Sequence, residues 1–331
     1  MKLNIKIARP WFAISACLTL CLLMLGNISW SQEDTTAAVT EAVVEEEPEA
    51  PAKTKPVKNT FQSVWIIDNQ TVLVPVKGTL ELDIMHRFGT IDNGYEDFWG
   101  FFAPSNIRLG LSYAPIDKLN LGFGITKSNM LWDASAKYSI ITQTKGKYPV
   151  SVTYYGNMAY DTRKDPDNSL FRYSTDRLSF FNQLIFARKV TENFSIQVAP
   201  SISHQNSVAG YYTKNDSTGK ETFKEMLHDH WAIAVSARYK LTPVTSIMIN
   251  YDQPLTEHAT RNPNPNLSFG VEFNTSSHSF QLFMGNYFFL NQQRNNLFNQ
   301  NSPFSYTDAT DKKIKGGKYL IGFNITRLWN Y

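Results

Sequence analysis

From residue 79 onward, apolar and polar side chains alternate in a dozen separate stretches. Side chains on a β-strand point to opposite faces in turn, so each stretch predicts one strand with an apolar face and a polar or small face. We expect strands near residues 79–88, 106–113, 119–126, 132–140, 150–158, 177–189, 194–205, 230–240, 244–252, 267–274, 278–286 and 318–331. The stretch at 177–189 alternates poorly around Phe180, Phe181 and Asn182, which predicts a β-bulge there.

The connections between these stretches fall into two classes that alternate along the chain. The short class comprises 114–118, 142–149, 190–193, 241–243 and 275–277. The other class comprises 89–105, 127–130, 161–176, 206–229, 253–266 and 287–317, and all but the second are long. Outer-membrane barrels have an even strand number, short periplasmic turns and longer outer loops. The sequence therefore predicts an all-β fold, a transmembrane antiparallel barrel of about 12 strands over 79–331, with both termini in the periplasm.

The composition favours a membrane barrel over a soluble β-sandwich, which would also alternate. Charged residues make up 18% of the chain, compared with about 25% in soluble domains, and aromatic residues make up 14%. No apolar run long enough for a helical span follows the amino-terminal segment. Aromatic residues also gather at the predicted strand ends, as in a membrane-interface girdle: Tyr113, Trp132, Tyr138, Tyr154, Tyr160, Trp231, Tyr239, Tyr251 and Trp329.

The final stretch, 318–331, carries aromatic and aliphatic residues at its odd positions and ends on an aromatic residue. Many outer-membrane barrels use such a strand as their insertion signal, so Trp329 and Tyr331 are expected to engage the barrel-assembly machinery. We expect the odd positions to face lipid, the even positions to face the lumen, and the strand to close the barrel against 79–88. Arg327 would then lie on the lipid side, near enough to the periplasmic end to reach headgroups.

The amino terminus predicts a secretory signal peptide over residues 1–31, with a basic start, an apolar run and small residues before Gln32. An alternative is a lipoprotein acylation box ending at Cys17. The only cysteines, Cys17 and Cys21, lie in this segment, so the cleaved chain would contain no disulfide. Cleavage would also remove three of the 32 basic residues and none of the 29 acidic ones. The resulting charge balance gives no indication of a nucleic-acid partner.

Two further segments precede the barrel. Residues 32–60 are rich in Glu, Lys and Pro and lack aromatic residues, which predicts a disordered periplasmic tether. The tether is either a solvated spacer or a periplasmic docking tail for a partner or for the cell wall. Residues 61–78 predict a hairpin with its turn at Asp68–Gln70, lying beneath the barrel or partly inside it.

Several motifs resemble an uncharacterised outer-membrane β-barrel family of Bacteroidota. They are His86-Arg87-Phe88-Gly89, Phe98-Trp99-Gly100, the run 107–113, Leu121-Gly122-Phe123-Gly124, the run 149–153 and Asp229-His230-Trp231-Ala232. The resemblance covers about residues 61–331. It implies a barrel in the outer membrane and its lipid, and it implies no activity.

Charged side chains on the polar faces are the candidate lumen and selectivity residues: Glu81, Asp83, Arg87, Arg108, Asp133, Lys137, Arg238 and Glu272. In a water-filled lumen their mixed signs predict a weak charge preference. Glu81 and Asp83 share a face, as a general acid–base pair would. Because opposite charges converge there, we favour a salt-bridged lining and expect no catalytic residue.

Three histidines offer alternatives. His228 and His230 are spaced to point the same way and are weak metal candidates. A site would need a third ligand such as His204, His86 or Asp133 to converge on them, so we expect no metal and no cofactor. His204 and Ser207 are the only candidates for an envelope-lipid hydrolase, although a spacing of three puts them on opposite faces of a strand.

The outer loops leave the function open. The aromatic segment 98–102 and the Asn- and Gln-rich segment 291–305 could each constrict the lumen or bind a ligand outside. We therefore expect a narrow porin-like or transport channel. The alternative is a closed scaffold or binding barrel that docks a periplasmic or extracellular partner, a periplasmic one through 32–60 and the hairpin at 61–76.

Overall fold

The computed structural model describes residues 55–214, 221–307 and 311–330. The predicted signal peptide (1–31), most of the predicted tether (32–60) and Tyr331 of the predicted insertion signal lie outside the described residues. Among the described helices, none has the length and apolar character needed to cross a membrane.

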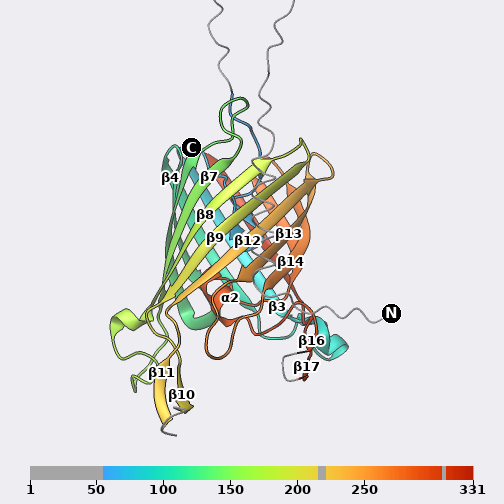
Figure 1. The fold of residues 1–331 in the computed structure, drawn as a ribbon. Coiled ribbons are helices and arrows are strands. Elements are labelled where there is room, and N and C mark those ends of the chain that lie inside the picture. The colour runs from blue at the N-terminus through green and yellow to red at the C-terminus, as the bar shows by residue number, and fades with distance from the viewer. Residues whose placement is uncertain (1–54, 215–220, 308–310, 331) are drawn as a thin grey trace, which may run out of the picture.

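Twelve antiparallel strands form a closed barrel, as the sequence predicted (Figure 1). They are β3 (Thr79–Thr90), β4 (Asn106–Ile116), β5 (Leu119–Thr126), β6 (Leu131–Ile141), β7 (Ser151–Asp161), β8 (Leu178–Lys189), β9 (Phe194–Gln205), β12 (Asp229–Lys240), β13 (Thr245–Pro254), β14 (Asn266–Asn274), β15 (His278–Gly285) and β18 (Leu320–Asn330). Each strand pairs with its neighbours in this order, and β18 pairs with β3 to close the barrel.

The strands separate an interior face from an outer face. Along β18 the even positions 320–326 are buried in the interior, and the odd positions are partly exposed on the outer face, as expected. Arg327 lies on the outer side, with its guanidinium carbon 4.8 Å from the ring centre of Trp329. This cation–π contact helps to stabilise the guanidinium near the end of the strand.

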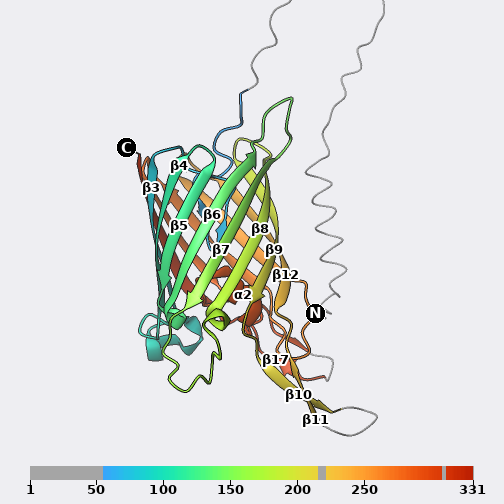
Figure 2. The ribbon, with the colours of Figure 1, turned by 90° about the vertical axis from the view of Figure 1, so that its left-hand side faces the viewer.

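The two ends of the barrel differ. At one end of the barrel Asn330 pairs with Thr79, and Pro56 bridges to Thr144 in the connection between β6 and β7. We call this end, which carries the label C in Figures 1 and 2, the terminal rim. The opposite end, the loop rim, carries the longer connections with their small elements. These elements are η1 (Ile91–Asp97), η2 (Ser128–Met130), η3 (Ser174–Arg177), β10 (Gly210–Lys214), β11 (Glu221–Glu225), β16 (Tyr306–Thr307) and β17 (Lys313–Ile314). The helix α2 (Gln292–Phe298) lies at the same end, within the barrel mouth.

The predicted bulge at Phe180–Asn182 is wrong. β8 pairs with β7 and β9 in continuous register, and its side chains alternate regularly. Phe181 points inward, where it is 1% exposed and lies against Tyr155 with ring centres 6.2 Å apart. The expected pattern placed polar residues at inward positions, as in a water-lined wall. Phe181 departs from it because this part of the interior is an apolar core.

The hairpin of residues 61–76, which we call the plug, lies inside the barrel except at its end, where Val76 is exposed (Figure 2). Its strands β1 (Trp65–Ile66) and β2 (Asn69–Gln70) are two residues each, so the turn is Ile67–Asp68 and not the predicted 68–70. Ile67 adopts a left-handed φ of 61°, which is unfavourable for a β-branched residue. The barrel wall holds it there, because Gln281 accepts a bond from Ile67 N (3.1 Å) and Asn324 donates one to Ile67 O.

We expect Phe181→Ala to lower the free energy of unfolding by about 3–5 kcal/mol, because it empties a packed site between the plug and the wall. Phe180→Ala is the matched control, since Phe180 is the adjacent residue on the outer face. Urea unfolding in vesicles, followed by tryptophan fluorescence, measures both. Equal losses for the two variants would contradict this placement of Phe181.

Candidate functional site: the occluded lumen

The plug fills the interior of the barrel. Its apolar residues Phe61, Val64, Trp65, Ile66 and Ile67 are each 5% exposed or less. Part of this surface forms a core with inward residues of the wall: Tyr155, Phe181, Ile185, Ala187, Ala199, Ala234, Met248 and Phe283. The described residues therefore close the lumen with a packed hairpin.

Barrel side chains satisfy the peptide groups of the plug. A hairpin with two residues in each strand leaves most of its backbone N–H and C=O groups unpaired, and such groups are costly when buried. Gln281 Nε2 donates to Trp65 O (2.8 Å), and Gln197 Nε2 donates to Gln70 O (2.9 Å). These long amide side chains on the wall take the place of a neighbouring strand.

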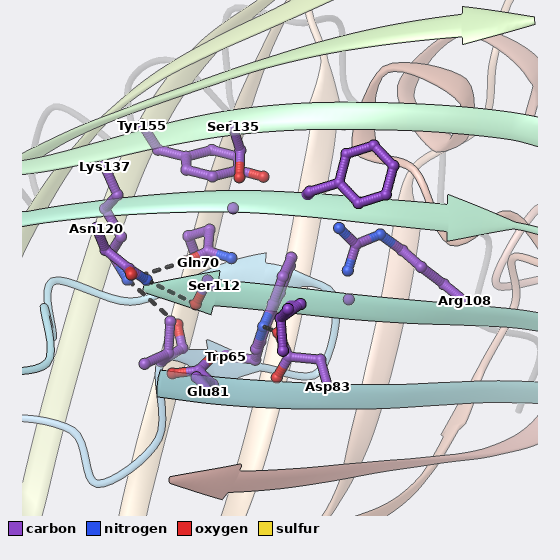
Figure 3. A pocket seen from close by; sticks show the side chains of 15 residues that line it. Trp65, Gln70, Glu81, Asp83, Arg108, Ser112, Asn120, Ser135, Lys137 and Tyr155 are labelled. Carbon is purple, nitrogen blue, oxygen red and sulfur yellow. Dashed lines mark hydrogen bonds between the residues drawn. The ribbon is translucent and has the colours of Figure 1, made fainter. Parts of the chain in front are cut away.

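Plug side chains also bond to charged groups of the wall. Trp65 Nε1 donates to Asp83 Oδ2 (3.0 Å), Lys137 Nζ donates to Gln70 Oε1 (2.9 Å), and Asn69 Nδ2 donates to Asp252 Oδ1 (2.7 Å). Figure 3 shows Trp65 and Gln70 projecting between Asp83 and Lys137. The cavity that remains there has about 20 Å³, room for roughly one water molecule.

All eight predicted lumen residues lie in the interior and are 6% exposed or less. Two pairs form buried salt bridges, Arg108–Asp133 at 2.7 Å and Arg238–Glu272 at 2.8 Å. Arg87 belongs to neither pair, and its guanidinium carbon lies 4.4 Å from the ring centre of Phe283. Arg238 also donates to Gln62 of the plug. The structure thus brings these charges together around the plug in separate groups.

The tip of the plug meets a connection of the loop rim. Gln292 Nε2 donates to Asp68 O (2.8 Å) and Asn295 Nδ2 donates to Asp68 Oδ2 (3.2 Å). The Tyr287 hydroxyl donates to Asp68 Oδ1. We call Asp68, Tyr287, Gln292 and Asn295 the latch. The sequence predicted that segments 98–102 and 291–305 each constrict the lumen or bind a ligand outside. Segment 291–305 enters the barrel, because it contains α2.

The aromatic segment at 98–102 remains at the loop rim. Phe102 is 82% exposed, and Phe98 and Trp99 are also exposed. The sequence singled out both this segment and 291–305 without distinguishing them. It gave no local signal for the latch, because Asp68 and Tyr287 are 219 residues apart. The wall amides Gln197 and Gln281 could have been found as long polar residues on inward positions of their strands.

The sequence predicted that His228 and His230 point the same way. They do not, because His228 precedes β12. His228 Nδ1 lies 2.6 Å from Gln205 O at the loop rim, whereas His230 is buried in the interior with its Nδ1 3.0 Å from His258 Nε2. Burial lowers the pKa of His258, which favours the neutral ring in this contact. Within the described part of the chain, no three His, Cys, Asp or Glu side chains gather as metal ligands.

The hydrolase candidates do not form a pair. His204 Nδ1 bonds Asp229 Oδ1 at 2.7 Å, and its ring stacks on His228 with centres 5.9 Å apart. Between described residues, no hydrogen bond joins His204 to Ser207. The geometry therefore does not make His204 a general base for Ser207.

A family model described as "Membrane bound beta barrel domain (DUF5777)" matches residues 61–329. The chain belongs to this family. The match covers the plug and the barrel together, and it agrees with the resemblance found in the sequence as far as a membrane-bound barrel of unassigned function. No curated protein matches the chain.

Several solved barrels are similar in structure at low sequence identity. An outer-membrane channel of Pseudomonas putida F1 is 12% identical, with 78% of this chain and 97% of that chain covered and a TM-score of 0.43. The toluene transporter TodX of Pseudomonas putida is 8% identical, with 78% and 91% covered and a TM-score of 0.35. LpxR of Salmonella typhimurium is 9% identical, with 75% and 99% covered and a TM-score of 0.32. At these scores the function must be argued from the residues of this chain.

We expect Arg108→Met to cost about 3–5 kcal/mol of unfolding free energy, because it leaves the Asp133 carboxylate buried without its counter-charge. The double variant Arg108→Met/Asp133→Leu should recover most of this loss. Glu192→Gln, which breaks the pair between Lys189 and the 89% exposed Glu192 side chain, should cost about 1 kcal/mol or less. Urea unfolding measures all three, and a loss for Arg108→Met as small as for Glu192→Gln would contradict the buried ion pair.

Proposed function

We propose that this protein is a gated transport channel of the outer membrane, closed by the plug and opened when the plug moves. The observation that carries the proposal is the polar wall. Inward positions hold charged and amide side chains around most of the barrel, although the closed interior contains an apolar core. A permanently packed interior is more stable with apolar residues than with partly satisfied polar ones.

Many polar atoms of this wall have no partner in the closed state. Among the described residues, they include Gln183 Oε1, Gln197 Oε1, Ser203 Oγ, Ser246 Oγ and Arg87 Nη2. Each such atom costs roughly 1–3 kcal/mol when buried without a hydrogen bond. Water in an open lumen would satisfy them, so a lumen that is hydrated part of the time accounts for the wall better than a permanently filled one.

The orientation belongs to the same proposal. Pro56 and Asn330 both lie at the terminal rim, where the connections are short. Short turns on the periplasmic side are usual for outer-membrane barrels, and the predicted tether 32–60 would extend from this rim. We therefore assign the terminal rim to the periplasm and the loop rim to the cell exterior. Residues 1–31 would be the signal peptide, 32–60 the tether, and 61–78 the hairpin segment that contains the plug. The plug would then be reachable by a periplasmic partner through the tether.

Selectivity follows from the wall. With the plug displaced, Arg87, Arg108, Lys137 and Arg238 would line the lumen together with the carboxylates of Glu81, Asp83, Asp133 and Glu272. Asp252 adds one further acidic group. Because both signs are interspersed, we propose a weak charge preference and passage without catalysis.

One observation favours the second candidate, a closed binding barrel. The apolar part of the plug, with Phe61, Ile66 and Ile67 against Phe181 and Ile185, is packed as in a permanent core. Such a barrel would present the plug and tether to a periplasmic partner and would never conduct. Conductance separates the two candidates.

The first test joins the plug to the wall. Asn69→Cys and Asp252→Cys place thiols at two contacting side chains in a chain whose other cysteines, Cys17 and Cys21, lie in the predicted signal peptide. In planar bilayers the wild-type protein should show reversible single-channel steps. The double variant joined by a short reducible thiol crosslinker should be silent until a reductant is added. Each single-cysteine variant, treated identically, should still open. A silent wild-type protein would support the closed barrel and overturn the channel.

The second test weakens the latch. Asp68→Ala removes the acceptor of Tyr287 and Asn295 and destabilises the closed state by about 1–3 kcal/mol, so the open probability should rise about tenfold or more. Asp167→Ala is the control, because Asp167 is an exposed carboxylate in an outer loop. If both variants open as often as the wild type, the latch does not hold the plug.

A further inference from the structure

A cleft of about 610 Å³ lies at the loop rim, outside the plugged lumen. Its walls come from the end of β3 at Thr90, from Ala103 and Pro104, from the loop that contains α2, and from Lys315 to Leu320. This volume lies within the range of small-molecule sites, about 300–1,000 Å³. The segments that form it are far apart in sequence and meet where the first and last barrel strands pair.

Phenylalanine side chains form an apolar surface in the cleft. Phe288, Phe289 and Phe298 line it, with ring centres 6.3 Å apart for Phe288–Phe289 and 6.5 Å apart for Phe289–Phe298. Arg294 fixes two of these rings from behind the lining, since its guanidinium carbon lies 4.9 Å from the Phe289 ring centre and 4.8 Å from that of Phe298. Phe298 is still 41% exposed. The rings are therefore held in place while one remains open to a ligand.

The amides of the cleft are committed to its own framework. Asn301 Nδ2 donates to Asn286 O (2.9 Å), and Asn286 Nδ2 donates to Pro265 O (2.9 Å). Asn299 Nδ2 donates to Asn266 Oδ1 (2.9 Å). These bonds make the walls rigid, so ordering them on ligand binding would cost little conformational entropy.

Two ammonium groups supply the charge of the cleft. Lys315 and Lys318 both line it. Lys318 Nζ lies 3.3 Å from Asp92 Oδ2 in a half-exposed pair, which a competing carboxylate could replace at little cost. No acidic side chain lines the cleft itself among the described residues. An apolar surface beside a positive edge is complementary to an apolar molecule with one negative group.

We propose that this cleft binds a small amphipathic carboxylate, with its apolar body on the phenylalanine rings and its carboxylate at Lys315 and Lys318. This inference deepens the proposed function, because the cleft would be the outer entrance of the channel and the bound molecule its cargo class. Tyr287 connects the two, since it lines the cleft and also donates to Asp68 in the latch. A ligand that shifts Tyr287 would release the tip of the plug.

The test is calorimetric titration of the full protein in lipid nanodiscs with 4-phenylbutyrate, and with 4-phenyl-1-butanol as the uncharged analogue. The carboxylate should bind about five- to tenfold more tightly than the alcohol, as expected for a charge-assisted contact at a partly exposed edge. Lys315→Gln/Lys318→Gln should remove this difference. Ala103→Phe, which fills the cleft, should weaken binding of both probes about tenfold or more.

The control variant is Lys145→Gln/Lys147→Gln, which removes two exposed lysines at the terminal rim. It should bind both probes as the wild type does. Heat-modifiable migration on gels shows that each variant is a folded barrel. Absence of binding, or binding that Ala103→Phe leaves unchanged, would overturn the site. Equal affinity for the acid and the alcohol in the wild type would overturn the assigned ligand class.

The same titration with the plug crosslinked through Asn69→Cys and Asp252→Cys separates this proposal from the gating proposal. The cleft lies outside the crosslinked contact, so 4-phenylbutyrate should still bind. Loss of binding only in the crosslinked protein would contradict a preformed cleft. A channel that gates normally but binds neither probe would leave the proposed function standing and remove this inference.

Discussion

The hydrogen-bonding requirement of a short hairpin enclosed in a barrel determines how the interior is built. β1 and β2 pair only two residues each, so the remaining peptide groups of the plug must find partners where little water can reach. Gln197 and Gln281 supply them from the wall. The same side chains could bind water once the hairpin leaves. A wall whose side chains can bond either to peptide groups of the plug or to water is compatible with both a closed and an open state.

The closed state also joins the two halves of the chain. The tip of the plug at Asp68 contacts Tyr287 and α2, which belong to the last connection at the loop rim. The segment from the terminal rim and the segment from the loop rim therefore block the lumen together. Because Tyr287 also lines the outer cleft, an event at the cell-exterior side of the proposed channel could reach the plug through one side chain.

Much of the barrel could be predicted because lipid and lumen impose a period of two on every strand, and the closure of β18 on β3 followed from the same pattern. Two of the errors have a common cause, because Phe181 on the wall and Ile67 at the turn of the plug are both buried in the apolar core between plug and wall. The error for His228 and His230 is separate and arose because His228 lies just before β12. The latch lay beyond reach, since nothing local in the sequence pairs Asp68 with a tyrosine 219 residues away. The placement of the eight luminal charges followed from alternation, whereas their partners depended on the plug.

State-dependent accessibility of the plug tests the central claim most directly. Gln70→Cys places a thiol at a position that is 3% exposed in the closed lumen. Its modification by an impermeant charged thiol reagent can be followed while the current of the same channels is recorded. If the plug moves to open the channel, the modification rate should rise in proportion to the open time. The contradictory result is a channel that conducts while the thiol is modified as slowly as in closed channels. Ions would then pass by a route that leaves the plug in place.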